Sequence, residues 1–294
     1  MKNPQGERLR PVTGRHNALL KLVRRAFARS ELTPEGECAV EGVRIVEEAI
    51  RSGLRLRAVL FSESGQARAA RLLPQLANQV ETLLLPDKLF TSVVPSESPQ
   101  GVAALVRVKS YALEELLGAG KNAPALVVAV AGVQDPGNLG TIVRSAEAFG
   151  ATGVLLGENT VSAYNSKAVR ASAGSAFRVP LLKQELKMAL PALRQHGLCL
   201  LATSSHKGTA VNDVQLTSPM ALLVGSEGAG LAREIMALVD EVVAIPHSPR
   251  VESLNVGMAA SIVLYEAARQ RTLFTTETQR HGEEQGNKNL GKDK

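Results

Sequence analysis

The stretch ALVVAVAGVQDPGNLGTIVRSAEAFG, residues 125–150, decides the fold class. Its opening segment, Ala125–Ala131, is continuously apolar, which is typical of a strand buried on both faces of a parallel sheet. A Pro136-Gly137 turn follows, and Leu139–Phe149 has the apolar spacing of a helix. A buried strand that leads through a turn into a helix is the repeating unit of α/β folds, so the sequence predicts one here.

The same alternation continues to the end of the apolar sequence. We predict further strands at Gly153–Leu156, Leu198–Ala202, Ala221–Val224 and Glu241–Ile245. We predict helices at Ser166–Ala173, Glu185–His196 (interrupted by Pro191), Ala232–Val239 and Val256–Arg271. Strands that alternate with helices in this way indicate a mostly parallel sheet.

A smaller α/β region precedes this domain. Its expected strands are Cys38–Val40, Arg57–Phe61, Val80–Leu85 and Gly101–Val108, and its expected helices are His16–Arg29, Val43–Ser52 and Gln66–Leu73. We therefore divide the chain into a disordered basic arm (1–14), a small α/β domain (15–110), a linker with one helical turn (111–123), a larger α/β domain (124–272) and a disordered tail (273–294).

Composition narrows the class of protein. Hydrophobic residues make up 45% of the chain and aromatic residues only 3%, so the cores should be aliphatic. Cys38 and Cys199 have no zinc-ligand spacing, and we interpret them as core residues of a protein in a reducing compartment. We expect no metal site. No apolar run is long enough to span a bilayer, and no signal peptide is evident, so we expect a soluble cytoplasmic protein without a membrane partner.

The positive charge is concentrated at the beginning of the chain. Residues 1–110 hold 17 Lys and Arg against 11 Asp and Glu, which equals the whole formal net charge of +6. On the predicted helix His16–Arg29, the basic side chains, among them Lys21, Arg24 and Arg25, lie mostly opposite the apolar face. They indicate either a polyanion-binding surface, with RNA as the partner, or simply a solvated N-terminal region.

Three strand–helix junctions in the larger domain carry unusual polar residues, and ligands of α/β sheets bind at such junctions. The first holds Asn138, which is a plausible helix N-cap, and Arg144 six residues further on. The two side chains can share a broad helix face. Arg144 also has a simpler interpretation, since a long cationic side chain on an apolar helix can extend to solvent.

The second junction, LVGSEGAGL at Leu223–Leu231, is rich in glycine but matches neither a dinucleotide fingerprint nor a phosphate-binding loop. Glu227 would repel a phosphate or favourably charge the next helix, so the ligand is not expected to be a phosphate. At the third junction, Ser253 and Asn255 are both plausible N-caps, although the helix needs only one.

Taken together, the three junctions resemble the three motifs of the SPOUT superfamily, and specifically its SpoU-type (TrmH family) RNA 2′-O-ribose methyltransferases. The matching strings are NLGTIVRSAEAFG (138–150), SKAVRASAGS (166–175), LLVGSEGAGL (222–231) and IPHSPRVESLNVGMAASIVLYEA (245–267). ECAVEGVRIVEEAIRSGLRLRAVLF (37–61) is similar to the substrate-binding domain of that family, which is related to a ribosomal-protein fold. The resemblance spans roughly residues 15–271.

The resemblance implies a trefoil-knotted sheet, S-adenosylmethionine as cofactor and a homodimer formed through the C-terminal domain. It places the cofactor against Gly225, Ile245, Leu254 and the turn around Thr203. It also implies a catalytic set, namely Arg144, Asn138, Glu227, Ser253 and Asn255. Because an Arg resists deprotonation in proteins, we expect Arg144 to remain charged and to stabilise the developing 2′-oxyanion and orient the adjacent phosphate, in contact with the RNA.

The chain departs from the family pattern at Thr141, His247, Pro249 and Gly257. Pro249 fixes φ and removes an N–H, which affects the third motif and puts substrate choice in doubt more than catalysis. A separate basic N-terminal domain favours ribosomal RNA, with the large subunit as the expected substrate. Three alternatives are a transfer RNA methyltransferase, an RNA-binding protein of the same fold without catalysis, and a nucleotide- or phosphate-using enzyme, which the missing glycine fingerprints disfavour.

Overall fold

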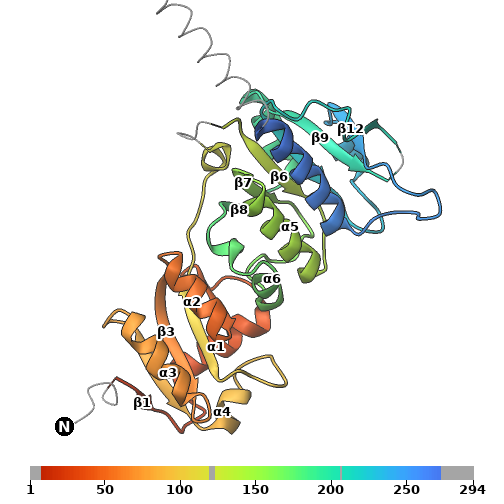
Figure 1. The fold of residues 1–294 in the computed structure, drawn as a ribbon. Helices are drawn as coiled ribbons and strands as arrows, with labels where there is room; N and C mark the ends of the chain where they lie inside the picture. The colour runs from red at the N-terminus through yellow and green to blue at the C-terminus, as the bar shows by residue number, and fades with distance from the viewer. Residues whose placement is uncertain (1–7, 119–122, 206, 273–294) are drawn as a thin grey trace, which may run out of the picture. The chain divides into compact units, whose positions relative to one another are not determined.

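The computed structural model describes residues 8–118, 123–205 and 207–272. They form two compact units that are discontinuous in sequence (Figure 1). The first unit consists of Met1–Tyr111, Gln134–Arg144 and Val161–Pro180, and the second of Ala112–Val133, Ser145–Thr160 and Leu181–Lys294. Two segments of the predicted larger domain therefore pack with the first unit.

The first unit is built on a five-stranded mixed sheet in the order β1-β4-β3-β5-β2. Its strands are β1 (Arg10–Pro11), β2 (Glu37–Glu41), β3 (Arg55–Ser62), β4 (Glu81–Leu85) and β5 (Val102–Arg107). Its helices are α1 (Ala18–Arg29), α2 (Val43–Arg51), α3 (Gln66–Leu72), α4 (Asp87–Thr91) and α6 (Ser166–Ala171), with 3-10 turns at Leu73–Gln75 and Ser175–Phe177.

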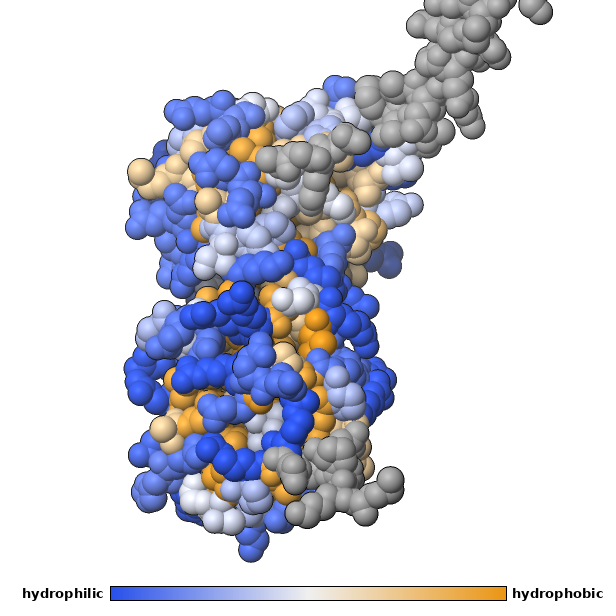
Figure 2. Space-filling view, turned by 90° about the vertical axis from the view of Figure 1, so that its left-hand side faces the viewer, coloured by the Kyte–Doolittle hydropathy of each residue, from blue (hydrophilic) through white to orange (hydrophobic). Residues whose placement is uncertain are grey.

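Helices cover both faces of this sheet, because successive strand residues point in opposite directions. Val59 and Phe61 pack in one core with α2, α3 and α6, whereas Ala58 and Leu60 pack in another with α1 and α4. On the face of this unit seen in Figure 2, hydrophobic residues reach the surface only in patches separated by hydrophilic ones. Cys38 lies in the first core, where burial raises the pKa of its thiol to about 12, as expected for a core residue.

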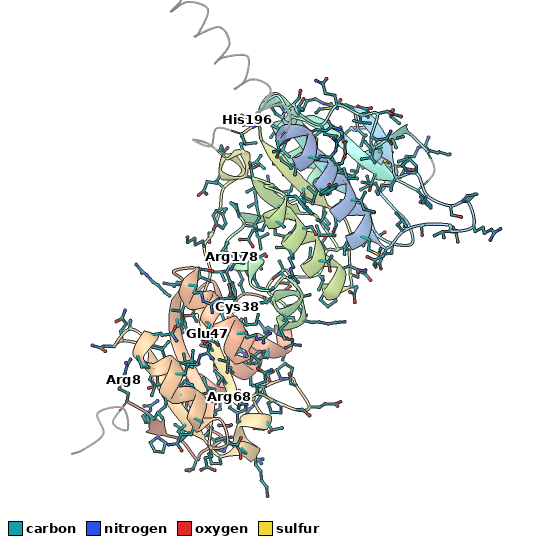
Figure 3. The ribbon with its side chains drawn as sticks, viewed as in Figure 1. Arg8, Cys38, Glu47, Arg68, Arg178 and His196 are labelled. Carbon is teal, nitrogen blue, oxygen red and sulfur yellow. The ribbon has the colours of Figure 1, made fainter. Side chains whose placement is uncertain are left out.

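Segment 161–180 joins this unit through both apolar and charged contacts. Val169 and Phe177 are buried in the core that α2 and α3 form with Val59 and Phe61, called the α2 core below. Two adjacent carboxylates of α2 form ion pairs outward: Glu47 with Arg71 at 2.7 Å, and Glu48 with Arg178 at 2.8 Å. Figure 3 labels Glu47 and Arg178 in this network. These contacts attach one of the four matching strings, residues 166–175, to the small α/β domain.

The second unit contains a seven-stranded, entirely parallel sheet in the order β10-β12-β9-β11-β6-β7-β8. The strands are β6 (Leu126–Val130), β7 (Gly153–Leu156), β8 (Leu181–Lys183), β9 (Cys199–Ser204), β10 (Thr209–Ala210), β11 (Met220–Val224) and β12 (Glu241–Ala244). Its helices are α7 (Leu186–Gln195), α8 (Arg233–Met236) and a closing helix over residues 256–272, with a 3-10 turn at Leu113–Leu117. Helix α5 (Pro136–Ala148) has residues in both units.

The predicted α/β class and the parallel sheet are confirmed, and several local expectations need correction. Part of the supposedly disordered arm is ordered, since Arg10–Pro11 pairs with β4 and the Arg8 guanidinium donates to three backbone carbonyls. Helix α7 continues through Pro191 without interruption. Helix α8 is shorter than predicted, because after Met236 the chain continues in i to i+3 turns. Residues 1–7 and the predicted tail, 273–294, lie outside the described residues.

Candidate active site

A pocket opens at the carboxyl ends of three neighbouring strands of the second unit. β9 lies between β12 and β11 in parallel register, so the connections that follow these strands meet at one edge of the sheet. They line a cavity of about 350 Å³, within the range of roughly 300–1,000 Å³ common for small-molecule sites. Six of the residues predicted for the site line it, namely Thr203, Gly225, Glu227, Ile245, Ser253 and Leu254.

The glycine-rich connection after β11 closes into a tight turn by backbone hydrogen bonds. Ser226 and Gly230 exchange backbone hydrogen bonds at 3.1 and 3.0 Å, which makes Glu227, Gly228 and Ala229 the tip of a tight turn. A Cβ on Gly225 would lie 2.4 Å from the carbonyl carbon of Gly230, closer than real Cβ atoms come. Gly225 is therefore required by the close approach of the backbone that forms this wall of the pocket.

The third junction supplies the opposite part of the lining. The Nδ1–H of His247 donates to the Ile245 carbonyl at 2.6 Å, since a carbonyl can only accept. Between them and the closing helix, Ser253 and Leu254 face the pocket. Asn255 does not line it: its Oδ1 accepts from the backbone N–H groups of Gly257 and Met258. Of the two predicted caps, Asn255 is the one that begins the closing helix.

Thr203 illustrates how the sheet itself positions a pocket residue. It lies near the carboxyl end of β9, paired with Val243 of β12. Its Oγ1 donates to the carbonyl of Leu223 in the adjacent strand β11, at 3.4 Å. The hydroxyl is thus held by the sheet, as expected for a rigid binding surface.

Asn138 and Arg144 lie on α5 and belong to the first unit, whereas the pocket belongs to the second. The interpretation of Asn138 as the N-cap of α5 is wrong. The helix begins at Pro136, and the Asp135 carboxylate accepts from the Asn138 N–H at 2.8 Å. This hydrogen bond, together with nearby Lys167, lowers the pKa of Asp135. The Asn138 side chain is therefore not needed as a cap.

Arg144 is solvent-exposed on α5. Within the described residues no hydrogen bond or ion pair engages its guanidinium, so its five N–H donors remain available to a ligand. Its neighbours in the helix, Ile142 and Val143, are buried, which matches the expected apolar setting. Arg144 is thus an exposed cation on a helix whose other face is buried. This placement agrees with both interpretations of Arg144, namely contact with RNA and simple extension to solvent.

The predicted RNA-binding helix is present as α1, with its apolar face in the core. Lys21 and Arg25 are exposed. Arg24 is half-buried, and its Nε donates to the Ser92 carbonyl at 3.1 Å, so part of its hydrogen-bonding capacity holds α1 to the segment after α4. Asn17 caps the helix through bonds to Leu19 and Leu20.

Pattern-based reasoning missed several pocket residues. Met236 and Leu231 supply apolar lining, and Ser205 and Ser226 supply hydroxyls. Their signal was available, since each follows or neighbours a predicted junction. Asp135 was missed as a cap, although a carboxylate directly before a proline at N1 is a recognisable helix start.

The pocket fits an uncharged or cationic small molecule better than a phosphate. Apolar side chains (Leu231, Ile245, Leu254) and backbone groups make up much of its wall, and the carboxylate at the turn, Glu227, disfavours anions. S-adenosylmethionine carries a positive sulfonium and no phosphate, so its chemistry agrees with this lining. In the described part of the chain, no helix is long and apolar enough to cross a membrane.

Comparisons with known proteins agree with this architecture. Residues 125–265 match the SpoU rRNA Methylase family, and residues 17–104 match the MRM3-like substrate binding domain. The chain is 32% identical to a 23S rRNA (uridine(2479)-2'-O)-methyltransferase of Streptomyces viridochromogenes, over 95% of this chain and 99% of that protein. It is 29% identical to the 23S rRNA (guanosine(2553)-2'-O)-methyltransferase RlmP of Bacillus subtilis, over 87% and 98% of the two chains.

Among solved structures, the SpoU methyltransferase AviRb of Streptomyces viridochromogenes in complex with AdoMet superposes with a TM-score of 0.75, at 30% identity, over 87% of this chain and 99% of that one. These matches, together with the parallel sheet and the pocket at its carboxyl edge, identify an S-adenosylmethionine-dependent RNA methyltransferase. The chain belongs to the SpoU rRNA methylase family. The predicted family, RNA methyltransferase class and cofactor are confirmed.

Proposed function

We propose that this protein transfers the methyl group of S-adenosylmethionine to one ribose 2′-hydroxyl of large-subunit ribosomal RNA, in the cytoplasm. The observation that carries the proposal is the pocket at the ends of β9, β11 and β12, which brings together six predicted site residues from the second and third junctions and the end of β9. Two relatives are named as 23S ribosomal RNA 2′-O-methyltransferases, and this chain matches nearly the full length of each. This supports ribosomal over transfer RNA as the substrate.

The pocket residues divide into binding and orienting roles. When bound, S-adenosylmethionine supplies an electrophilic methyl group. Gly225, Ile245 and Leu254 would hold it through backbone and apolar contacts, with Thr203 at the end of β9. Glu227 and Ser253 present polar groups into the same cavity, where they would orient the nucleotide and the reacting hydroxyl. Asn255 would not contact the ligand. It fixes the first turn of the closing helix and so holds Leu254, the residue before it, in place.

Arg144 would perform the electrostatic part of the reaction. An arginine resists deprotonation in proteins, so a neutral Arg144 acting as a general base is disfavoured. A charged guanidinium can instead stabilise the 2′-oxyanion as the hydroxyl proton is lost to solvent water, and it can hold the adjacent phosphate with a second pair of donors. Asn138, six residues earlier on the same helix, would complete the RNA-facing surface of α5.

From the family resemblance we also propose that the chain follows a knotted path and forms a homodimer. A stripe of large apolar side chains supports the dimer: Met258, Ile262 and Tyr265 on the closing helix are 56%, 37% and 55% exposed. Their spacing places them on one helix face. Phe149 extends the stripe, edge-on to Tyr265 with ring centroids 5.8 Å apart. A continuous exposed apolar stripe of this kind is typical of a protein–protein interface.

Charge placed in that stripe should separate the subunits. We expect wild-type protein to sediment as a dimer, and Ile262→Lys to sediment as a monomer, because an unpaired charge buried in an interface is costly. Met188→Lys is the matched control: Met188 is 66% exposed on α7 and lies outside the stripe, so this variant should remain dimeric. A monomeric wild-type protein in analytical ultracentrifugation would contradict the dimer proposal.

The basic surface of α1 should contribute to RNA affinity without sequence preference. Replacing Arg24 and Arg25 with Ala should weaken binding to all RNAs alike and lower the slope of log K against log salt by about 2, if both contact phosphates. A decrease of about 1 is the expected result if the bond from Arg24 to Ser92 withholds that side chain. An unchanged slope would show that α1 is only a solvated helix face.

The function itself is tested by offering labelled S-adenosylmethionine with unmodified ribosomal and transfer RNA pools, both as naked RNA and as ribosomal subunits. We expect label in large-subunit RNA alone. Label confined to transfer RNA would overturn the proposed substrate. Intact cofactor binding with no transfer to any pool would favour an RNA-binding protein that lacks catalysis.

A further inference from the structure

A second cavity, in the first unit, has the chemistry of a nucleotide-binding site. It measures about 720 Å³ and is lined by Glu41, Gly42, Arg44, Ile45, Ser96, Ser98, Gln100 and Arg170. These residues come from the end of β2, the start of α2, the loop before β5 and helix α6. Helix α1 packs in the core on the other face of the sheet, so this site is separate from its basic surface.

The cavity contains a buried acid with spare hydrogen-bonding capacity. Glu41 is 4% exposed, and Ser96 Oγ donates to its Oε2 at 2.7 Å. No other hydrogen bond or ion pair reaches this side chain within the described residues. A carboxylate has about four acceptor positions, so one with a single hydroxyl partner can accept further donors from a ligand in the cavity. Glu41 therefore selects a ligand that presents N–H or O–H groups.

Two arginines at the same cavity provide positive charge. Arg44 and Arg170 are exposed, and in the described part of the chain neither is engaged in an ion pair or hydrogen bond. They come from α2 and α6, segments that pack together in the α2 core. Together with Glu41 they give the cavity lining a net charge of +1, with the acid buried and the cations outside. This arrangement fits a ligand with internal donors and outer phosphates.

Glycine and glutamine complete the floor of the cavity. Gly42 has φ +103°, and a Cβ there would lie 3.3 Å from Gln100 Oε1. The missing side chain lets the Gln100 amide lie across the backbone between Glu41 and α2. An amide at this place can both donate to and accept from a base edge.

We propose that this cavity binds one unpaired guanosine of the RNA substrate. Guanine is the standard base whose Watson–Crick edge carries two adjacent N–H donors, and a carboxylate can accept both. Arg44 and Arg170 would contact the flanking phosphates. Reading unstacked bases by their edges is how proteins recognise RNA sequence. The inference rests on the proposed function only in taking RNA as the ligand, and it makes this cavity a determinant of substrate choice.

The test is binding of the full-length protein to short fluorescent oligouridines by anisotropy, without cofactor. One probe is uridine throughout, and others carry a single central guanosine, inosine or adenosine. The guanosine probe should bind roughly tenfold more tightly than oligouridine, inosine less so because it lacks the 2-amino group, and adenosine no better than uridine. Equal affinity for all four probes would overturn the proposal.

Variants separate the two parts of the site. Glu41→Gln keeps an acceptor for Ser96 but should remove the guanosine preference, because the amide cannot accept both N–H groups of the guanine edge. Arg44→Ala and Arg170→Ala should weaken binding to every probe and lower the salt slope by about 1 each. Both positions are exposed, so these two variants test the site even if Glu41→Gln does not fold.

Arg55→Ala is the matched control. Arg55 is exposed and pairs with Arg107 at one end of β5. Glu41 pairs with Ala103 near the other end of that strand, so Arg55 lies away from the cavity. It should change neither guanosine preference nor salt slope, and an effect equal to that of Arg44→Ala would reduce the site to general basic charge. Methyl transfer to ribosomal RNA without a guanosine preference would overturn this site alone. A guanosine preference without methyl transfer to any RNA would overturn the proposed function alone.

Discussion

The Gly225→Ala variant is expected to bind S-adenosylmethionine between about 10- and 100-fold more weakly than wild-type protein, as measured by isothermal titration calorimetry. The added methyl group would lie 2.4 Å from the Gly230 carbonyl carbon and 2.7 Å from the Leu231 nitrogen. Both are backbone atoms, so the turn that forms the pocket wall must move. Overpacking of this kind costs roughly 1–3 kcal/mol, and every 1.4 kcal/mol changes a binding constant tenfold.

Gly228→Ala in the same turn is the control. A Cβ on Gly228 meets nothing within 4 Å, although Gly228 lines the same pocket. This variant should bind the cofactor within about twofold of wild type, since surface substitutions usually change stability by less than 0.5 kcal/mol. Full cofactor affinity in Gly225→Ala, with a native circular dichroism spectrum, would contradict the assignment of this pocket to the cofactor.

Arg144→Ala should lose on the order of 100- to 1,000-fold in the rate of methyl transfer, the effect typical of removing one group that stabilises a developing oxyanion. Because the charge acts mainly in the transition state, the affinity for RNA should change little. Single-turnover methylation with saturating RNA measures the rate, and anisotropy measures the affinity.

Arg144→Lys distinguishes geometry from charge. Lysine keeps the positive charge but cannot form two parallel hydrogen bonds, so its rate should fall between those of Ala and wild type. Wild-type activity in Arg144→Lys would show that the planar guanidinium is not required. An equal loss of rate and RNA affinity in Arg144→Ala would assign Arg144 to substrate binding and not to the transition state.

Buried strands and the ends of strand–helix junctions were predictable because their signals are local. The apolar runs that contain β6, β9 and β11 stand out from flanking polar residues, and the observed strands agree within a few residues. The short edge strands β1, β8 and β10 and the short helix α4 escaped prediction. With two to five residues each, they lack a periodic pattern and depend on partners distant in sequence.

Local sequence patterns could not predict how the pocket is assembled, for the same reason. Periodicity places Thr203, Gly225 and Ile245 each at a strand end, but only the sheet order brings β12, β9 and β11 together. Likewise, no sequence pattern indicates that residues 161–180 pack into the core of the small α/β domain. The resemblance to SpoU-type enzymes supplied the roles, and the structure supplies the juxtaposition.

The position of the transferred methyl group tests the proposed 2′-hydroxyl chemistry most directly. Ribosomal RNA from a strain that lacks this protein should be methylated in vitro by the purified chain, digested to nucleosides and analysed by liquid chromatography with mass spectrometry. We expect one new nucleoside, with the added mass on the ribose, and its absence with Arg144→Ala at short reaction times. A methyl group on the base would contradict transfer to the 2′-hydroxyl.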